Sequence, residues 1–118
     1  MIDFACKQFD LRDVIKCSLG LSKSEYKIFQ YIFAKKEFLT TTDIAQNITL
    51  DQSTVQRGVK KLYEQKVLLR RQINLQGGGY SYAYAIVTDA LLEERICTIV
   101  STWVETVKHS LKNIKENI

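Results

Sequence analysis

Two closely spaced helix-start signals are the feature that most constrains this chain. Thr40 precedes Asp43 by three residues, a pair able to form a capping box, and Asp51 is a favoured type of helix N-cap. Only residues 48–51 connect the helix that Thr40 begins with the helix that Asp51 begins. The sequence therefore predicts a short helix at about 41–47, a tight turn and then a second helix.

The helix that Asp51 begins is predicted to have one aliphatic and one polar side. Val55, Val59 and Leu62 follow each other at spacings of four and three, and Tyr63 comes next, so all four are expected to face the core. Gly58 costs up to ~1 kcal/mol of helix propensity relative to alanine and predicts a close approach by another helix. The outward side then carries Gln52, Ser53, Gln56, Arg57 and Lys60, with Thr54 and Lys61 partly outward.

Two further helices are expected before this pair. Residues 11–19 predict a helix with Val14, Ile15 and Leu19 inward, which Gly20 ends. Ser22 and Glu25 form a second capping-box pattern, which predicts a helix to about Lys35. Its wide apolar face consists of Tyr26, Ile28, Phe29, Ile32 and Phe33.

A β-hairpin is expected after the polar helix. Residues 67–75 and 80–87 are rich in β-branched, aliphatic and aromatic side chains, and they flank Gln76-Gly77-Gly78-Gly79. Arg70 and Arg71 lie at the base of this hairpin on opposite faces, and strand alternation leaves open which of them contacts a ligand. Packing onto the body is favoured over base stacking for the tyrosines of the second strand, which are Tyr80, Tyr82 and Tyr84.

The C-terminal segment predicts a long helix capped by Thr88. A heptad seam is formed by Cys97, Val100, Val104, Val107, Leu111, Ile114 and Ile118. A second apolar stripe is formed by Leu92, Ile96, Ile99 and Trp103, whereas His109 lies off the seam and is expected at the surface. A chain of this size is too small to cover both stripes. We therefore expect the same helix of a second copy to cover the seam, rather than the chain's own N-terminal helix.

Charge is concentrated in the middle of the chain. The whole chain has 118 residues and a net charge of +4. Residues 52–87 hold six basic residues against Glu64 alone, a net +5, whereas residues 1–51 are neutral and residues 88–118 carry −1. A local positive field of this kind is expected for a surface that binds a polyanion.

Several classes of function are excluded. A single histidine, no phosphate-binding loop and no clustered carboxylates argue against an enzyme, and neither a metal nor a cofactor is expected. Cys6, Cys17 and Cys97 are too scattered for a disulfide framework, so we expect small buried residues, with redox sensing as the alternative. The N-terminus lacks the apolar stretch of a signal peptide, and no segment approaches a membrane span, so a cytoplasmic protein is expected.

The stretch LTTTDIAQNITLDQSTVQRGVKKLYEQKVLLRR resembles the winged helix-turn-helix signature of MarR-like and TrmB-like transcriptional regulators, most of all small archaeal TrmB-like proteins. Ile44, Ala45 and Leu50 stand where these families place packing residues. The resemblance covers about residues 21–87 and is looser in the last helix. It implies a mainly α fold with a small β-hairpin (α+β): an N-terminal helix in 1–20, a DNA-binding part in 21–87 and a long dimerisation helix in 88–118, all one compact domain.

The implied function is sequence-specific binding of double-stranded DNA by a homodimeric regulator, with the sign of regulation and any small-molecule effector open. Gln56 is expected to pair with adenine, Arg57 with guanine, and Ser53 and Thr54 with a phosphate or base edge. Gln52 also belongs to this set, whereas Lys60, Lys61 and either Arg70 or Arg71 are expected to meet phosphates. The alternatives are a weakly specific chromatin-like protein and a winged helix that docks on protein within a transcription complex.

Overall fold

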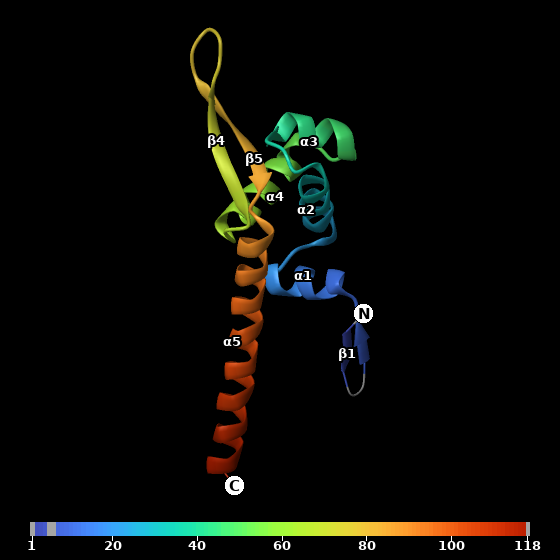
Figure 1. Cartoon of the computed structure of the whole chain (residues 1–118), viewed down its shortest axis with the longest axis vertical. Coiled ribbons are helices and arrows are strands. Elements are labelled where there is room, and N and C mark those ends of the chain that lie inside the picture. The colour runs from blue at the N-terminus through green and yellow to red at the C-terminus, as the bar shows by residue number, and fades with distance from the viewer. Residues whose placement is uncertain (1, 5–6, 118) are drawn as a thin grey trace.

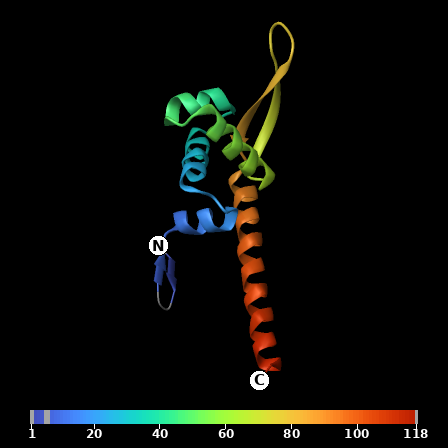
Figure 2. The ribbon, with the colours of Figure 1, turned by 180° about the vertical axis from the view of Figure 1, so that it is seen from behind.

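A computed structural model describes residues 2–4 and 7–117 of the chain (Figures 1 and 2). It contains five helices and five strands in these ranges. The elements, in chain order, are β1 (Ile2–Phe4), β2 (Lys7–Phe9), α1 (Leu11–Leu19), α2 (Lys23–Lys35), β3 (Leu39–Thr40), α3 (Thr41–Ile48), α4 (Gln52–Glu64), β4 (Leu68–Asn74), β5 (Tyr80–Ile86) and α5 (Asp89–Glu116). The predicted mainly α fold with a β-hairpin and a long last helix is confirmed.

The molecule is elongated because α5 projects from the body. Helices α2, α3 and α4 lie beside the β4–β5 hairpin, α1 lies against the first part of α5, the hairpin tip points away at one end, and the C-terminus lies at the other (Figure 1). The principal extents are 68 × 26 × 26 Å and the radius of gyration is 18.0 Å. A compact domain of ~100 residues has a radius of gyration of about 13 Å. Much of α5 therefore lies outside the packed body.

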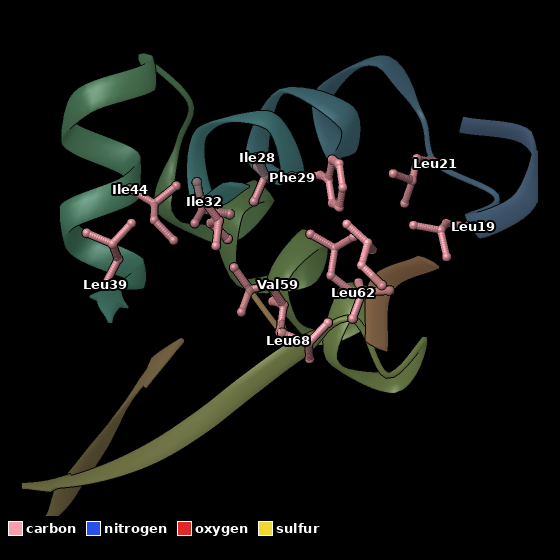
Figure 3. Close-up of a cluster of buried hydrophobic side chains, with 14 residues drawn as sticks. Leu19, Leu21, Ile28, Phe29, Ile32, Leu39, Ile44, Val59, Leu62 and Leu68 are labelled. Atoms are coloured by element: carbon pink, nitrogen blue, oxygen red, sulfur yellow. The ribbon is translucent and has the colours of Figure 1, made fainter. Parts of the chain in front are cut away.

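The core lies where α2, α3 and α4 meet the base of the hairpin (Figure 3). Ile28 and Ile32 of α2, Ile44 of α3 and Leu62 of α4 are fully buried. Each such side chain contributes about 1.5–3 kcal/mol when it leaves water. The remaining buried side chains of this cluster include Leu19, Leu21, Phe29, Leu39, Val55, Val59, Val67 and Leu68.

The predicted caps begin the helices as expected. In α2, the Glu25 amide donates to the Ser22 hydroxyl and the Ser22 amide donates to the Glu25 carboxylate, at 3.2 and 2.7 Å. Thr40 and Asp43 make the same reciprocal pair at the start of α3, both bonds at 3.1 Å. The Leu91 amide donates to the Thr88 hydroxyl at the start of α5. These bonds satisfy amides that have no partner within a helix.

The hairpin pairs as predicted, and a short extra strand completes the sheet. The strand order is β3-β5-β4, all antiparallel, with Arg70 opposite Tyr84 and Gln72 opposite Tyr82. Gly77, Gly78 and Gly79 at the tip all have positive φ angles, of 87°, 103° and 83°, which only glycine adopts without strain. The two-residue strand β3 and the separate β1–β2 hairpin were not predicted, because such short segments carry no periodic pattern.

Gly58 confirms the expected close approach of two helices. It is buried in α4 against α2, and a Cβ atom placed there would lie 2.5 Å from Cδ1 of Ile28. The space above Gly58 is thus already filled by a fully buried side chain.

Helix α5 is divided into a packed and an unpacked part. Leu92 is buried, and Ile96 and Ile99 are partly buried against the core. Arg95 donates to the backbone carbonyl of Gln65 at 2.8 Å, and Gln65 donates to the carbonyl of Leu19 at 3.1 Å. Gln65, just after α4, is therefore bonded both to Arg95 of α5 and to the end of α1. No described helix is both long and apolar enough to cross a membrane.

Several predicted environments were wrong. Tyr63 and Phe33 were expected in the core, but they are 36% and 37% exposed because they lie at the edges of their helices' apolar faces. Cys17 and Cys97 are free thiols at the surface rather than small buried residues, because neither lies on the buried side of its helix. Cys6 and Ile118, named in the sequence predictions, lie outside the described residues.

Candidate nucleic-acid interface

The outward side of α4 is polar and its inward side is sealed. Val55 and Leu62 are fully buried and Val59 is 1% exposed. The opposite side is exposed at Gln52, Ser53, Gln56, Arg57 and Lys60 and half-buried at Thr54. The predicted division of this helix is therefore present, apart from the exposed Tyr63.

A chain of hydrogen bonds orders the start of α4. The Asp51 carboxylate accepts from the Thr54 amide at 3.3 Å and also from the Thr54 hydroxyl. These bonds to Thr54 lower the pKa of Asp51 below its usual range. The Arg57 guanidinium in turn donates to the Thr54 hydroxyl oxygen at 3.5 Å. Thr54 thus connects the helix cap with an exposed arginine.

Gln52 joins the two helices of the helix-turn-helix. Its side-chain amide donates to the Thr41 hydroxyl at 2.8 Å. This bond connects the first turn of α4 with the first turn of α3.

Lys61 was predicted to contact a phosphate, but its ammonium group bonds to other residues of the chain. Its ammonium donates to the Glu25 carboxylate at 3.1 Å and to the backbone carbonyl of Gly20. Burial raises the pKa of Glu25, but the bonds from Ser22 and Lys61 outweigh it and leave the pKa below its usual range. Lys61 therefore connects α4 with α2 and the end of α1.

The other basic side chains of residues 52–87 have no acidic partner among the described residues. The ion pairs in these ranges join other residues, apart from the pair of Lys61 with Glu25. The unpaired cations are Arg57, Lys60, Lys66, Arg70 and Arg71, all exposed. The charge of Arg57 contributes to the lowered pKa of Asp51, and the other four cations leave a positive field, as expected for a surface that meets an anion.

The two arginines at the base of the hairpin lie on opposite faces, as predicted. The Arg70 guanidinium carbon lies 4.4 Å from the ring centre of Tyr63 in α4 and 4.3 Å from that of Tyr82 in β5. The Arg71 guanidinium carbon lies 4.4 Å from the ring centre of Phe38. Only Arg70 is therefore on the α4 side of the hairpin.

The tyrosines of β5 pack as expected near the body. Tyr84 meets the ring of Tyr63 edge-on at 6.3 Å, and Tyr80 meets Tyr82 at 5.5 Å. Tyr80 is 60% exposed because it lies toward the tip, beyond the body.

The seam of α5 is a second exposed surface of a different kind. Val104, Val107, Leu111 and Ile114 are between 50% and 57% exposed. Helix α1 reaches α5 only near its start, where both helices and α2 line an apolar groove of about 630 Å³ that includes Leu11, Ile15, Ile96 and Cys97. Within residues 2–4 and 7–117, nothing covers the seam beyond Val100, so the chain's own N-terminal helix is not its partner.

The structure thus brings most of the predicted residues to one surface and adds others. Tyr63 and Tyr82 were missed as partners of Arg70. Each contact joins Arg70 to a different element, α4 or β5, and the sequence does not show how these elements pack. Lys66 was counted with the basic residues of this stretch but was not predicted as a site residue. It is exposed in the turn between α4 and β4 with a φ of 66°, and its charge was the only sequence signal.

The helix-turn-helix, the hairpin on its flank and the exposed polar side of α4 define a winged helix-turn-helix protein, the architecture of MarR-type transcriptional regulators. A family model described as the DnaD N-terminal domain matches residues 9–107, and the chain belongs to that family.

Similar proteins come from several microorganisms. A solved structure described as a possible transcriptional regulator from Methanosarcina mazei Go1 is 41% identical, with coverage of 96% of this chain and 95% of that chain and a TM-score of 0.88. The uncharacterized protein MJ1503 of Methanocaldococcus jannaschii is 31% identical, with coverage of 94% of this chain and 93% of its own length. A mutant of S. aureus MepR bound to an oligodeoxyribonucleotide is 19% identical, with coverage of 91% and 81% and a TM-score of 0.54, a likeness of fold alone.

Proposed function

We propose that this protein binds double-stranded DNA as a homodimer and regulates transcription, with α4 in the major groove. One observation carries the proposal: the polar side of α4 is exposed and cationic, while its aliphatic side is sealed in the core. An α-helix fits the major groove, and its N-terminal half usually contacts base edges. The likeness of fold to a MepR mutant bound to an oligodeoxyribonucleotide supports DNA as the partner.

Within α4, separate residues supply sequence preference and affinity. Gln56 and Arg57 have the side chains that pair with adenine and guanine, and Ser53 lies beside them. Lys60 lies further along the helix, where a phosphate contact adds affinity without sequence information. Thr54 acts through Arg57, whose guanidinium it holds.

The homodimer forms through the seam of α5. Its exposed members repeat at alternating spacings of three and four, the pattern of a coiled-coil interface. We propose residues 21–87 as the DNA-binding part and residues 88–118 as the dimerisation part. Two copies of α4 then meet half-sites about one helical turn, roughly 34 Å, apart.

Selection of a preferred duplex from a random library, followed by fluorescence anisotropy at several salt concentrations, tests the proposal. Arg57→Ala is expected to relax base preference, and Lys60→Ala to weaken binding to all sequences and lower the salt slope by ~1. Lys112→Ala, an equal charge change on the far part of α5, is the matched control.

Other outcomes would identify another function. Equal, small effects of Arg57→Ala and Lys60→Ala would contradict base contacts by α4. Binding without preference over bulk DNA would indicate a chromatin-like protein. No DNA binding even at low salt would indicate a winged helix that docks on protein.

A further inference from the structure

The guanidinium of Arg70 lies over two aromatic rings from different elements. Tyr63 belongs to the end of α4 and Tyr82 to β5, and both ring centres lie within 4.4 Å of the guanidinium carbon. Cations are attracted to aromatic faces within about 6 Å. Two such contacts restrict the rotation of a long side chain that would otherwise sample many conformations. We call Arg70, Tyr63 and Tyr82 the arginine clamp.

The clamp leaves the hydrogen-bonding capacity of Arg70 unused. A guanidinium has five N–H donors, and aromatic faces interact with its charge and not with the donors at its edge. No carboxylate within the described residues pairs with Arg70, and its side chain is exposed. A held guanidinium with free donors is suited to bind an oxyanion in the bidentate way that arginine favours.

The position of the clamp connects α4 with the hairpin. Ser53, Gln56, Lys60 and Tyr63 follow at spacings of three, four and three, so they form one exposed stripe along α4. Tyr63 ends this stripe, and its ring contacts both Arg70 and Tyr84 of the hairpin. Arg70 therefore continues the surface that the proposed function places against DNA.

Arg71 offers a comparison within the same strand. It has the same charge and is also exposed, but its guanidinium lies against Phe38 on the other face of the sheet. The sequence could not distinguish these two arginines, whereas the structure places only Arg70 at the junction with α4.

We infer that Arg70 is the phosphate-binding residue of the hairpin and that Tyr63 and Tyr82 are positioning residues, which hold its guanidinium toward the backbone of a duplex bound by α4. The inference rests on the proposed function. The rigid side chain loses little freedom on binding, and the phosphate that it grips fixes the position of the hairpin relative to α4 along the groove.

Anisotropy titrations of a selected duplex at several salt concentrations test the role of Arg70. Arg70→Ala is expected to weaken binding by about 10-fold or more and to lower the salt slope by ~1, with Arg71→Ala as the control of equal charge that has a clearly smaller effect. Arg70→Lys keeps the charge and loses the planar fork, so the salt slope is retained while affinity falls. Ethylation interference identifies the phosphate: Arg70→Ala is expected to abolish interference at one phosphate per half-site.

Variants of the two rings test the clamp itself. Tyr63→Leu and Tyr82→Leu are expected to weaken binding by roughly three- to tenfold, whereas Tyr63→Phe and Tyr82→Phe keep the ring faces and bind as the wild type does. Thermal unfolding shows whether each variant folds. If a leucine variant does not fold, the binding data of Arg70→Ala and Arg70→Lys test the inference instead.

Two negative results have different meanings. Equal effects of Arg70→Ala and Arg71→Ala, with an unchanged interference pattern, would overturn the inference while DNA binding by α4 stands. Absence of DNA binding by the wild type would overturn the proposed function and this inference together.

Discussion

The polar side of α4 and the seam of α5 are both exposed, but they differ in how the chain supports them. The start of α4 is ordered by hydrogen bonds among Asp51, Thr54, Gln52 and Thr41, and most of its neighbouring cations form no ion pair with the acidic residues that the structure describes. The far part of α5 exposes valines, leucine and isoleucine with no tertiary support from the described residues. A charged surface is stable in water without a partner, whereas an apolar stripe of this length is expected to have one.

The largest expected effect comes from charge on the seam. Val107→Asp or Leu111→Asp would place an unpaired carboxylate in the proposed dimer interface, which costs about 3 kcal/mol or more. The dimer dissociation constant is then expected to rise by roughly 100-fold. Sedimentation equilibrium measures this change, and His109→Asp, off the seam on the same helix, is the control. A monomeric wild type at micromolar concentration would remove the contrast between the two surfaces.

A second substitution tests whether α4 depends on the packing beneath it. Gly58→Ala would force Cβ against Ile28, and overpacking of this kind costs about 1–3 kcal/mol, offset by up to ~1 kcal/mol of helix propensity. Urea unfolding should therefore show a net loss of unfolding free energy of up to about 2 kcal/mol. Ile28→Val removes the obstructing methyl group, so the double variant should lose less than the sum of the single ones. Additive losses would show that the contact with Ile28 is not the cause.

A third substitution concerns the connection between the two regions. Arg95→Ala would release the end of α4 from α5, since Arg95 donates to the Gln65 carbonyl. Affinity for a duplex with two half-sites is expected to fall by up to about 10-fold, because a looser connection between α4 and α5 adds the cost of fixing the spacing of the two α4 copies on binding. Affinity for a single half-site should stay unchanged in the same anisotropy assay. Lys108→Ala on the exposed part of α5 is the control, and equal losses on both duplexes would contradict a role in spacing.

The smallest expected effect is on the pH dependence of stability. The pKa values of Glu25 and Asp51 are lowered in the folded protein, so the unfolded state binds more protons in acid. Their contribution is present above the unfolded values, near 4.5 and 3.8, and is lost as the pH falls through the folded ones. Glu25→Gln should reduce this loss by at most about 1 kcal/mol, the range of partly exposed ion pairs. Thermal unfolding between pH 3 and pH 7 measures this loss of stability. A steeper loss in Glu25→Gln than in the wild type would contradict a stabilising role of the Glu25 carboxylate.

Local sequence patterns predicted the helices and the hairpin, but they did not predict contacts between residues far apart in the chain. The caps at Ser22, Thr40, Asp51 and Thr88 are short-range hydrogen bonds, so the sequence located the helix starts. Gly58 could be interpreted because a helix interior seldom holds glycine without a packing reason. The bond of Lys61 to Glu25 and the clamp around Arg70 join residues far apart in the chain. Strand alternation placed Arg70 and Arg71 on opposite faces of the hairpin. Only the packing of the hairpin against α4 shows that Arg70 is the one that lies on the α4 side.

The unsupported length of α5 has one more consequence. Every described side chain from Ser101 onward is exposed, so helix formation there receives no help from the rest of the chain. Isolated helices of about 12–15 residues are marginal in water. In the proposed homodimer, the helix content of the far part of α5 therefore depends on protein concentration. A dilute sample is expected to show less helical ellipticity than a concentrated one, and the amide protons of the last turns are expected to exchange faster as the share of monomer rises.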